Sequence, residues 1–477
     1  MNVNATVDTP QTPDLAAPCA AFAAGLKFAD LPDSTVEKTL LNLYDTLACS
    51  LAGFTADGAR ELRALVTEWG GKPQAPVLWT RDRLPAPAAA WINGTMAHAR
   101  DYDDTHDAAI IHVGVSSIPA ALAAVDMADH PVSGEDFIAA VAAGLELSTR
   151  MAFATTVGVI ESGFIYSSLM GYFGATVAAS RVLGFDAAQT QNAMGIAYAQ
   201  AAGGHQATRD AALTKRMHPG FAARAAMVSV ALTQKGVRGS QNIFEGEDGL
   251  WRIYLNSAPD RAALLDRLGE HFHLEDLGYK PYPCCRFNHT AIDAAKEIRA
   301  MPGFDWRKVS EVRVYSNRQC QSAVGTPLEI RQAPQTLVQA QFSSPYNIAC
   351  ALINGEVSLA DFSDVSALSR PDIQTLTAKV TPLVDETIER DWGRNVSPSR
   401  VEAVVDGKTF SAQVDQPKGS KDLPMTRSEM RRKLEDCLAT GGFSPELADA
   451  FETTIEGLPA SRDVAADIRA LMDKVGS

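Results

Sequence analysis

Apolar residues recur at steps of three and four along most of the first half of the chain, from about Ala16 to Asp260. This is the spacing of one face of an α-helix. The clearest example is Thr35–Leu51, whose start Asp33 or Ser34 can cap and whose end Gly53 can mark. Further segments with this period predict the helices Ala86–Asp103, Ser117–Met127, Gly134–Ala152, Met170–Leu183, Ala187–Ala202 and Pro219–Lys235. Many are rich in alanine and glycine, so we expect them to be buried and closely packed.

The pattern changes near Leu277. Val309–Tyr315 alternates as a β-strand does, and Ala378–Leu383 is a second candidate strand. Val401–Val405 and Lys408–Val414 flank Asp406-Gly407, which is typical of a hairpin with a type I′ turn. The segments between these strands predict the helices His289–Ile298 and Pro345–Leu352. This region therefore predicts an α+β unit.

Helical periodicity returns in Thr426–Thr440, Leu447–Glu456 and Ser461–Val475. The order helical, α+β, helical predicts a mainly α fold with two domains. Residues 15–275 and 424–477 form a large, discontinuous all-helical domain, residues 276–420 form a smaller α+β lid domain, and residues 1–14 form a loose N-terminal tail. A junction of this kind usually leaves a cleft, which is a favoured site for small molecules.

The composition limits the classes of function and partner that the protein can have. The 477 residues are 46% hydrophobic and 21% charged, as in ordinary globular proteins. The net charge of −14 disfavours nucleic acid and anionic membrane surfaces as partners. No apolar run reaches the roughly 18 residues of a membrane span. The seven cysteines are scattered without a C-x-x-C pair, which favours a reduced, cytoplasmic protein.

The densest polar cluster spans residues 93–107 and is followed by His112. If the helix continued past His98, then His98, Asp101 and Thr105 would share one face. The cluster can serve a metal-free site in which Asp and His bind and protonate a substrate. It can also be only a solvated helix end. A third interpretation is the metal site of a hydrolase, with the ligands Asp101, Asp103, His106 and His112.

Two further clusters are basic. Lys215 and Arg216 precede a predicted helix whose first turn suits Pro219, and the N–H groups of such a start can bind a carboxylate. The alternative is a basic surface loop. The segment from Lys280 to His289 is stiffened by two prolines, so it can also be a rigid hinge. There is no G-x-S-x-G, P-loop or G-x-G-x-x-G motif in the sequence.

Residues 93–105, Lys215–Gly220 and Lys280–His289 together resemble the MmgE/PrpD family. The family includes 2-methylcitrate dehydratase, cis-aconitate decarboxylase and iminodisuccinate epimerase. Weaker matches at residues 43–48, 171–175 and 344–346 extend the resemblance over nearly the whole chain. The resemblance implies a large helical domain, a smaller α+β lid, a homodimer and no cofactor or metal.

The resemblance also implies site residues. Asp101, Thr105, His112, Lys215 and His289 fall where the decarboxylase members have active-site residues. Ile165 stands where those members have a histidine, which argues against decarboxylation of cis-aconitate, although Tyr166 can supply a phenol one residue later. The expected catalytic residues are Asp101, His112, Lys215 and His289, and the expected substrate-binding residues are Thr105, Arg216, Tyr166 and Arg286.

The chemistry common to this family occurs at the carbon next to a carboxylate. It needs a base, here Asp101 or His112, and cations that stabilise the enediolate. Lys215 can bind the carboxylate or deliver a proton, and His289 can act as the opposing acid. We therefore predict a cofactor-free lyase or isomerase for a small anionic di- or tricarboxylate, with dehydration first and epimerisation second. A metal-dependent hydrolase and a non-catalytic helical interaction protein are the alternatives from other classes.

Overall fold

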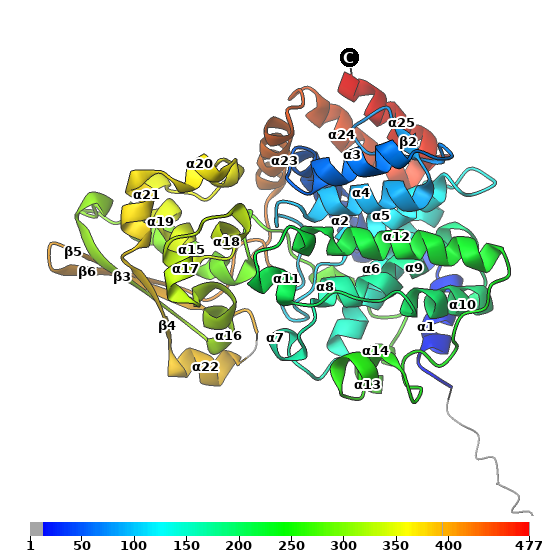
Figure 1. The fold of residues 1–477 in the computed structure, drawn as a ribbon, viewed down its shortest axis with the longest axis horizontal. Helices are drawn as coiled ribbons and strands as arrows, with labels where there is room; N and C mark the ends of the chain where they lie inside the picture. The colour runs from blue at the N-terminus through cyan, green and yellow to red at the C-terminus, as the bar shows by residue number, and fades with distance from the viewer. Residues whose placement is uncertain (1–12, 394, 477) are drawn as a thin grey trace, which may run out of the picture.

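The computed structural model describes residues 13–393 and 395–476, and these residues form two bodies that lie side by side (Figure 1). The larger body is helical, and the smaller body contains a four-stranded sheet with helices around it. The prediction of a mainly α fold with a small α+β part is confirmed. Of the expected tail, residues 1–12 lie outside the described residues. Asp14 is buried and accepts N–H groups of Phe244 and Glu245, so it is part of the helical body.

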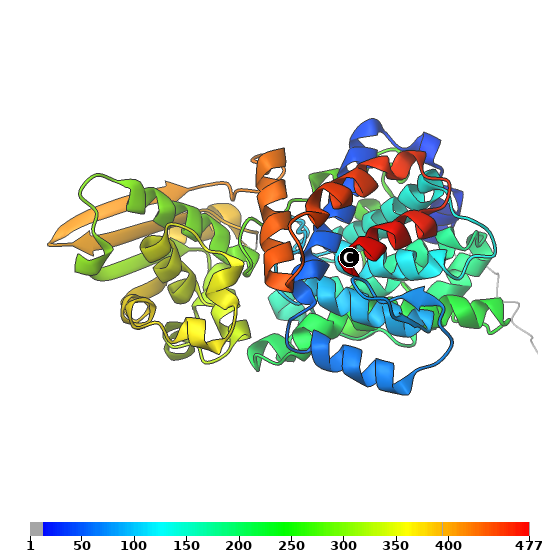
Figure 2. The same cartoon turned by 90° about the horizontal axis from the view of Figure 1, so that it is seen from above.

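The helical body contains elements from both ends of the chain, with the last three helices returning after the smaller body (Figure 2). Its helices are α1 Ala16–Gly25, α2 Asp33–Gly53, α3 Ala59–Trp69, α4 Ala86–His98, α5 Gly114–Val125, α6 Gly134–Phe153, α7 Val159–Ser162, α8 Tyr166–Leu169, α9 Gly171–Val182, α10 Ala187–Tyr198, α11 Gln206–Arg209, α12 Thr214–Gln234, α13 Leu250–Leu255, α14 Arg261–Leu265, α23 Arg427–Gly441, α24 Leu447–Gly457 and α25 Val464–Asp473. A short antiparallel pair, β1 Ala75–Pro76 and β2 Arg83–Leu84, joins α3 to α4.

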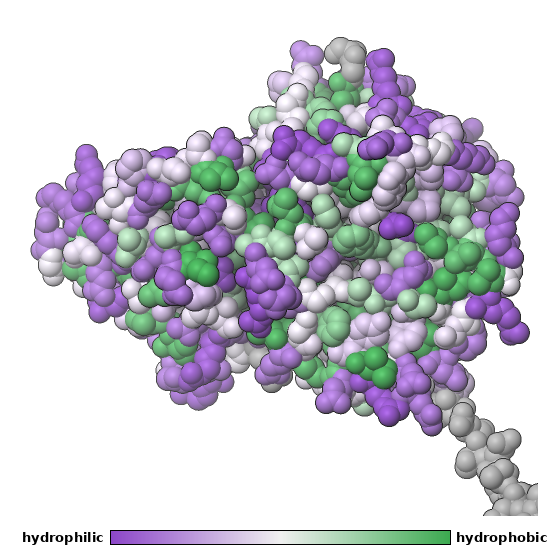
Figure 3. Space-filling model, viewed as in Figure 1, coloured by the Kyte–Doolittle hydropathy of each residue, from purple (hydrophilic) through white to green (hydrophobic). Residues whose placement is uncertain are grey.

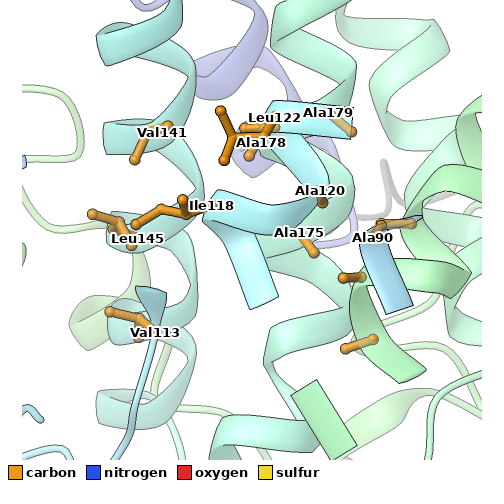
Figure 4. Packing of buried hydrophobic residues seen from close by; sticks show 14 of the residues in the cluster. Ala90, Val113, Ile118, Ala120, Leu122, Val141, Leu145, Ala175, Ala178 and Ala179 are labelled. Atoms are coloured by element: carbon orange, nitrogen blue, oxygen red, sulfur yellow. The ribbon is translucent and has the colours of Figure 1, made fainter. Parts of the chain in front are cut away.

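The centre of this body is α5, all of whose residues are buried. Figure 4 shows its side chains packed against those of α6 and α9, with alanine at many of the contacts. A methyl group on Gly144 of α6 would lie 2.7 Å from the carbonyl oxygen of Gly174 in α9. Small residues therefore let these helices approach closely, as expected from the composition.

The smaller body has its own core beneath a mixed sheet. The strands β3 Val309–Ser316, β4 Val380–Val384, β5 Ser399–Val405 and β6 Lys408–Val414 lie in the order β4-β3-β5-β6, and only β3 and β4 are parallel. The helices are α15 His289–Ala300, α16 Arg318–Cys320, α17 Leu328–Gln332, α18 Leu337–Gln341, α19 Ser344–Asn354, α20 Val365–Leu368, α21 Pro371–Thr377 and α22 Glu386–Trp392. Asp406 and Gly407 have φ of 51° and 79°, as the predicted type I′ hairpin turn requires.

Two predicted helix ends are wrong by five residues, and both of these errors fall at polar clusters. α4 ends at His98, five residues before Asp103, and Asp101 adopts a left-handed backbone with φ of 54°. His98, Asp101 and Thr105 therefore do not share one helical face. α12 begins at Thr214, so Lys215 and Arg216 lie in its first turn and Pro219 lies inside the helix.

The segment after α4 also pairs with the connector between the bodies. Thr105 and Gly278 form a two-way backbone bridge, with N···O distances of 2.9 and 2.7 Å. The returning chain joins them, because the Tyr279 N–H donates to the Gly419 carbonyl at 2.8 Å. These contacts bring the first polar cluster to the boundary between the two bodies.

Hydrophilic residues cover most of the face drawn in Figure 3, and the apolar residues on it form small separate groups. Within the described parts of the chain, no helix combines the length and the apolar character needed to cross a bilayer.

The contact between α4 and α12 offers a test of the packing. A Cβ atom on Gly220 would lie 2.4 Å from the Trp91 carbonyl oxygen, which is backbone and cannot rotate away. We expect Gly220→Ala to lower the free energy of unfolding by about 1–3 kcal/mol, measured by chemical denaturation. Gly25→Ala is the control, because no atom lies within 4 Å of its added Cβ, and it should change stability little. An equal effect of the two substitutions would contradict this account of the helix contact.

Candidate active site

A cavity opens where the segment after α4, the first turn of α12 and the connector meet. Both bodies contribute to its wall, since Phe342 and Gln319 come from the smaller one. Of the eight predicted site residues, six line it: Asp101, Thr105, His112, Tyr166, Lys215 and Arg286. The three polar clusters of the sequence thus meet at one place.

Asp101 is the centre of the charged part of the cavity. Its carboxylate accepts from the ammonium group of Lys215 and, at 3.2 Å, from that of Lys280, which also donates to the Asp101 carbonyl at 3.0 Å. All three residues are at least nine-tenths buried. Burial alone would raise the pKa of Asp101, but the two lysine charges outweigh it and hold the pKa well below its ordinary value. Two cations therefore share one anion.

The local backbone explains how Asp101 reaches both lysines. The chain leaves α4 in a turn in which the Asp101 N–H donates to the His98 carbonyl at 3.2 Å. The left-handed conformation that follows is one that aspartate tolerates better than most residues. It turns the chain out of the helix direction, so that the carboxylate lies between α12 and the connector.

His98 holds Lys215 from the other side. Its Nδ1 donates to the Asp103 carboxylate at 2.9 Å, and its Nε2 lies 3.0 Å from the Lys215 Nζ. Burial lowers the pKa of His98 despite the nearby Asp103 charge, so the ring is neutral. The proton on Nδ1 leaves Nε2 to accept from the ammonium group. Lys215 is therefore fixed between a carboxylate and a neutral imidazole.

His112 is a second neutral imidazole. Its Nδ1 donates to the Asp104 carbonyl, and its backbone N–H donates to the Ser167 Oγ at 2.9 Å. Burial, helped by the Lys280 charge, lowers the pKa of His112 to about 3. The ring therefore keeps an unprotonated Nε2, and its side chain is 20% exposed on the cavity wall. This is the arrangement of a histidine that can accept a proton.

Asp104 positions the loop that carries His112, and it does not line the cavity. Its carboxylate accepts the backbone N–H groups of Val113 and Gly114, at 3.0 and 3.1 Å, where α5 begins. Burial and the neighbouring Asp103 charge raise the pKa of Asp104 to about 7. The loop that carries His112 is thus tied to α5, a fully buried helix.

Arg286 is on the wall, but its charge is already paired. It forms a bidentate pair with Asp107, with N···O distances of 2.8 and 2.7 Å, and donates to the Lys418 carbonyl at 2.9 Å. The pair joins the segment after α4 to the connector and to the returning chain. This ion pair holds the two bodies together beside the cavity.

Two predicted site residues are not on the cavity wall. His289 is fully buried, accepts from Arg286 at Nδ1 and lies 3.3 Å from the Cys284 carbonyl through Nε2. Burial and the Arg286 charge hold the pKa of His289 well below its ordinary value, so it orients Arg286 and cannot act as the opposing acid from this position. Arg216 donates to the Asp57 carbonyl at 3.0 Å and is likewise buried away from the cavity.

Tyr166, the residue expected to supply a phenol, does line the cavity. Its hydroxyl, however, donates to the Val157 carbonyl.

The metal-site interpretation of the first cluster also fails. Asp101 is engaged by lysines, Asp103 by His98, and both ring nitrogens of His106 contact backbone groups, of Ala109 and His273. Among the described residues no three His, Cys, Asp or Glu side chains are grouped so that they could hold a metal ion. Of the proposed ligands, Asp103 and His112 lie 3.5 Å apart, between Oδ2 and Nδ1, and no third described residue completes a metal-binding group with them.

Several wall residues escaped prediction. Lys280 lies in a segment that the sequence singles out, yet a hinge was an equally good interpretation of it. His98 and Asp103 were visible in the first cluster, but their contact depends on the end of α4. His205 and Gln319 lie outside the three clusters and carry no signal in the sequence, because each reaches the cavity from a different, distant segment.

Comparison of the sequence with known proteins gives two family matches and several relatives. A family model described as the MmgE/PrpD N-terminal domain matches residues 18–262, and one described as the MmgE/PrpD C-terminal domain matches residues 282–458. The chain is 25% identical over 459 residues to a cis-aconitate decarboxylase-like protein of Aspergillus oryzae, covering 92% of this chain and 93% of the relative. It is 25% identical over 426 residues to the cis-aconitate decarboxylase of Homo sapiens, covering 86% and 85%.

The low pKa of His112 predicts a contribution to acid sensitivity. The pKa falls from 6.5 to about 3 on folding, so its contribution to stability is complete above pH 6.5 and is lost as the pH falls towards 3. The free energy of unfolding should decline by up to about 1.4 kcal/mol per pH unit from this group alone. His112→Asn keeps an N–H donor near Nδ1 but does not titrate, so its urea midpoint should fall less steeply on acidification than that of the parent. His130→Asn, at an exposed site, should retain the parent slope, and an unchanged slope in His112→Asn would contradict the assignment.

Proposed function

Because this chain belongs to the MmgE/PrpD family, we propose that it is a lyase that removes a proton from the carbon next to a carboxylate, and that it catalyses a dehydration. The single observation that carries the proposal is the sharing of Asp101 by Lys215 and Lys280 on the wall that also carries the neutral His112. Two ammonium groups meet one carboxylate there, so they can also bind a substrate carboxylate.

The lysines are suited to stabilise the charge that develops. When the α-proton leaves, negative charge moves onto the carboxylate oxygens to form an enediolate. Lys280 is fully buried, and burial alone would lower its pKa, but the charges of Asp101 and Asp103 together outweigh burial and raise the pKa, so it stays cationic. Cations held in a site that excludes water interact more strongly with such charge than cations in solution. Asp101 keeps both in place.

His112 is the proposed base. Asp101 is a poor candidate, because its low pKa and its two lysine partners make its carboxylate weakly basic. The unprotonated Nε2 of His112 takes the proton, and a substrate carboxylate nearby would favour the imidazolium that forms. Elimination of the β-hydroxyl then needs a proton on the departing oxygen, and Lys215 is the proposed donor. The products are an unsaturated acid and water.

Decarboxylation of cis-aconitate is the second candidate, because it is the activity in the names of the relatives. The family histidine is replaced by Ile165, which lines the cavity with an apolar side chain. This substitution favours dehydration. Epimerisation is the third candidate. It needs an acid on the opposite face of the substrate, and His289, the residue expected in that role, does not line the cavity. The homodimer that the family resemblance implies stays a prediction.

The role of His112 can be tested directly. Incubation of the protein with small hydroxy acids in D₂O, followed by NMR, reports elimination, decarboxylation and exchange of the α-proton together. We expect His112→Asn to lower the rate of all proton removal by about 10²–10⁴-fold while carboxylate binding changes little. His130→Asn is the matched control. Turnover at the parent rate in His112→Asn would refute its role as base.

The role of Lys215 needs two substitutions. Lys215→Ala should lose both carboxylate binding and turnover, because it removes the charge and leaves Asp101 with one partner. Lys215→Arg should keep weak binding, since the charge remains, and lose most turnover, since the guanidinium has a different shape and does not donate its proton. Calorimetry with a non-reactive carboxylic acid measures binding. Tight binding by an inactive Lys215→Ala would show that this lysine is not part of the carboxylate site.

A further inference from the structure

The backbone around Asp101 is held at three successive carbonyl groups. The carbonyls of residues 100, 101 and 102 accept, in this order, from the side chains of Gln341 at 2.7 Å, Lys280 at 3.0 Å and Lys433 at 2.6 Å. All three donors are buried. They come from α18 of the smaller body, from the connector and from the returning helix α23. Three distant parts of the chain therefore meet on one short segment.

This segment needs donors from elsewhere because of its conformation. Residues 100–102 follow the end of α4, are buried, and belong to no helix or strand. Carbonyl groups at and beyond a helix end have no N–H partner within the helix, and a buried carbonyl without a donor is unfavourable. Side chains supply the donors here. The left-handed backbone of Asp101 therefore depends on contacts outside its own helix.

Lys433 is the donor with the firmest anchor. Its Nζ also donates to the Asp45 carboxylate of α2 at 2.6 Å and lies 4.2 Å from the centre of the Tyr102 ring. Burial acts to lower the pKa of Lys433, but the surrounding groups, Asp45 first among them, raise it to about 12. Burial raises the pKa of Asp45 to about 6, although Lys433 acts to lower it. Both members of this buried pair are therefore charged at neutral pH.

Lys433 is not itself part of the cavity wall, but its contact leads there through Tyr102. The carbonyl of Tyr102 accepts from Lys433, and its hydroxyl donates to the Pro281 carbonyl at 3.3 Å. Pro281 follows Lys280, whose ammonium group contacts the Asp101 carboxylate. Movement of Tyr102 would therefore disturb both the carboxylate and one of its two lysine partners.

We infer that Lys433 is a positioning residue of the candidate active site. Its hydrogen bond to the Tyr102 carbonyl holds Asp101 in the left-handed conformation that brings the carboxylate to both lysines. The returning C-terminal segment thus takes part in the site, although none of its described residues lines the cavity. The effect on turnover rests on the proposed function, whereas the effect on the Asp101 backbone does not. The competing explanation is that the pair only packs α23 against α2.

The variant removes the pair as a whole. Lys433→Met alone would leave the Asp45 charge buried without a partner, so the test uses Asp45→Asn/Lys433→Met in the full-length protein. Glu146→Gln/Arg150→Met is the matched control. That pair is also fully buried, with an N···O distance of 2.6 Å, and Arg150 also donates to a backbone carbonyl, that of Asp266, at 2.8 Å. Neither of its members has a hydrogen bond to residues 100–102.

The first readout is an NMR signal from Asp101 itself. Asp101-Tyr102 is the only Asp-Tyr step in the sequence, so labelling aspartate carbonyls with ¹³C and tyrosine amides with ¹⁵N gives one correlated signal. We expect this signal to shift in Asp45→Asn/Lys433→Met and to keep its parent position in the control. An unchanged signal in Asp45→Asn/Lys433→Met, or an equal shift in both variants, would overturn the inference.

The second readout is turnover. Proton removal from malate and citrate in D₂O, followed by NMR, gives kcat and KM. We expect Asp45→Asn/Lys433→Met to lower kcat by about 10–10²-fold and to change KM by less than about threefold, because Lys433 acts through the placement of Asp101. A parent kcat, or a loss confined to KM, would overturn the inference. If the parent protein removes no proton from either acid, the proposed function is contradicted for these acids, and the NMR signal decides the positioning role by itself.

Discussion

The structure around the cavity depends on one buried carboxylate. Asp101 is reached by Lys215 from α12 and by Lys280 from the connector, so a single side chain joins three segments that are far apart in sequence. Removing charges from water is costly, and such a cluster is stable only when every member is paired and hydrogen-bonded. That condition is met here, since Lys280 also reaches the Asp101 carbonyl and Lys215 also reaches His98. The same contacts that fix the two bodies therefore fix the groups that would meet a substrate.

The packing of the helical body decides where Lys215 can be. α12 lies against α4 at Gly94 and Gly220, where a Cβ on Gly94 would come within 3.0 Å of the Gly220 Cα. A larger residue at either position would push the helices apart and move the first turn of α12. Such a movement would also displace the residues that pack against this turn, because protein interiors are densely packed. Gly94 and Gly220 do not line the cavity, yet the close contact that they allow sets the distance between Lys215 and Asp101.

The sequence could predict most of the fold but only part of the site. Helices such as α2 and α6 and the β5–β6 hairpin follow from local periodicity and turn residues, which is why their predicted positions agree with the structure within a few residues. The end of α4 and the start of α12 were missed because tertiary ion pairs, and not local pattern, decide the backbone at Asp101 and Lys215. His289 and Arg216 stand close in sequence to residues that line the cavity, yet their own side chains are buried away from it. His205 and Gln319 could not be found, since their position depends on how the two bodies meet.

Burial keeps the histidines of the cavity wall uncharged. His98, His112 and His205 each have a pKa below the ordinary value, and in each case desolvation is the largest cause. Neutral rings can accept and relay protons without repelling the lysines. If these rings were solvated, the cavity would gain positive charge as the pH fell through 6 to 7, and its preference among acids would change with pH. Because burial keeps these rings out of water, the positive charge of this part of the wall stays on the two lysines beside Asp101, which is where the proposed function needs it.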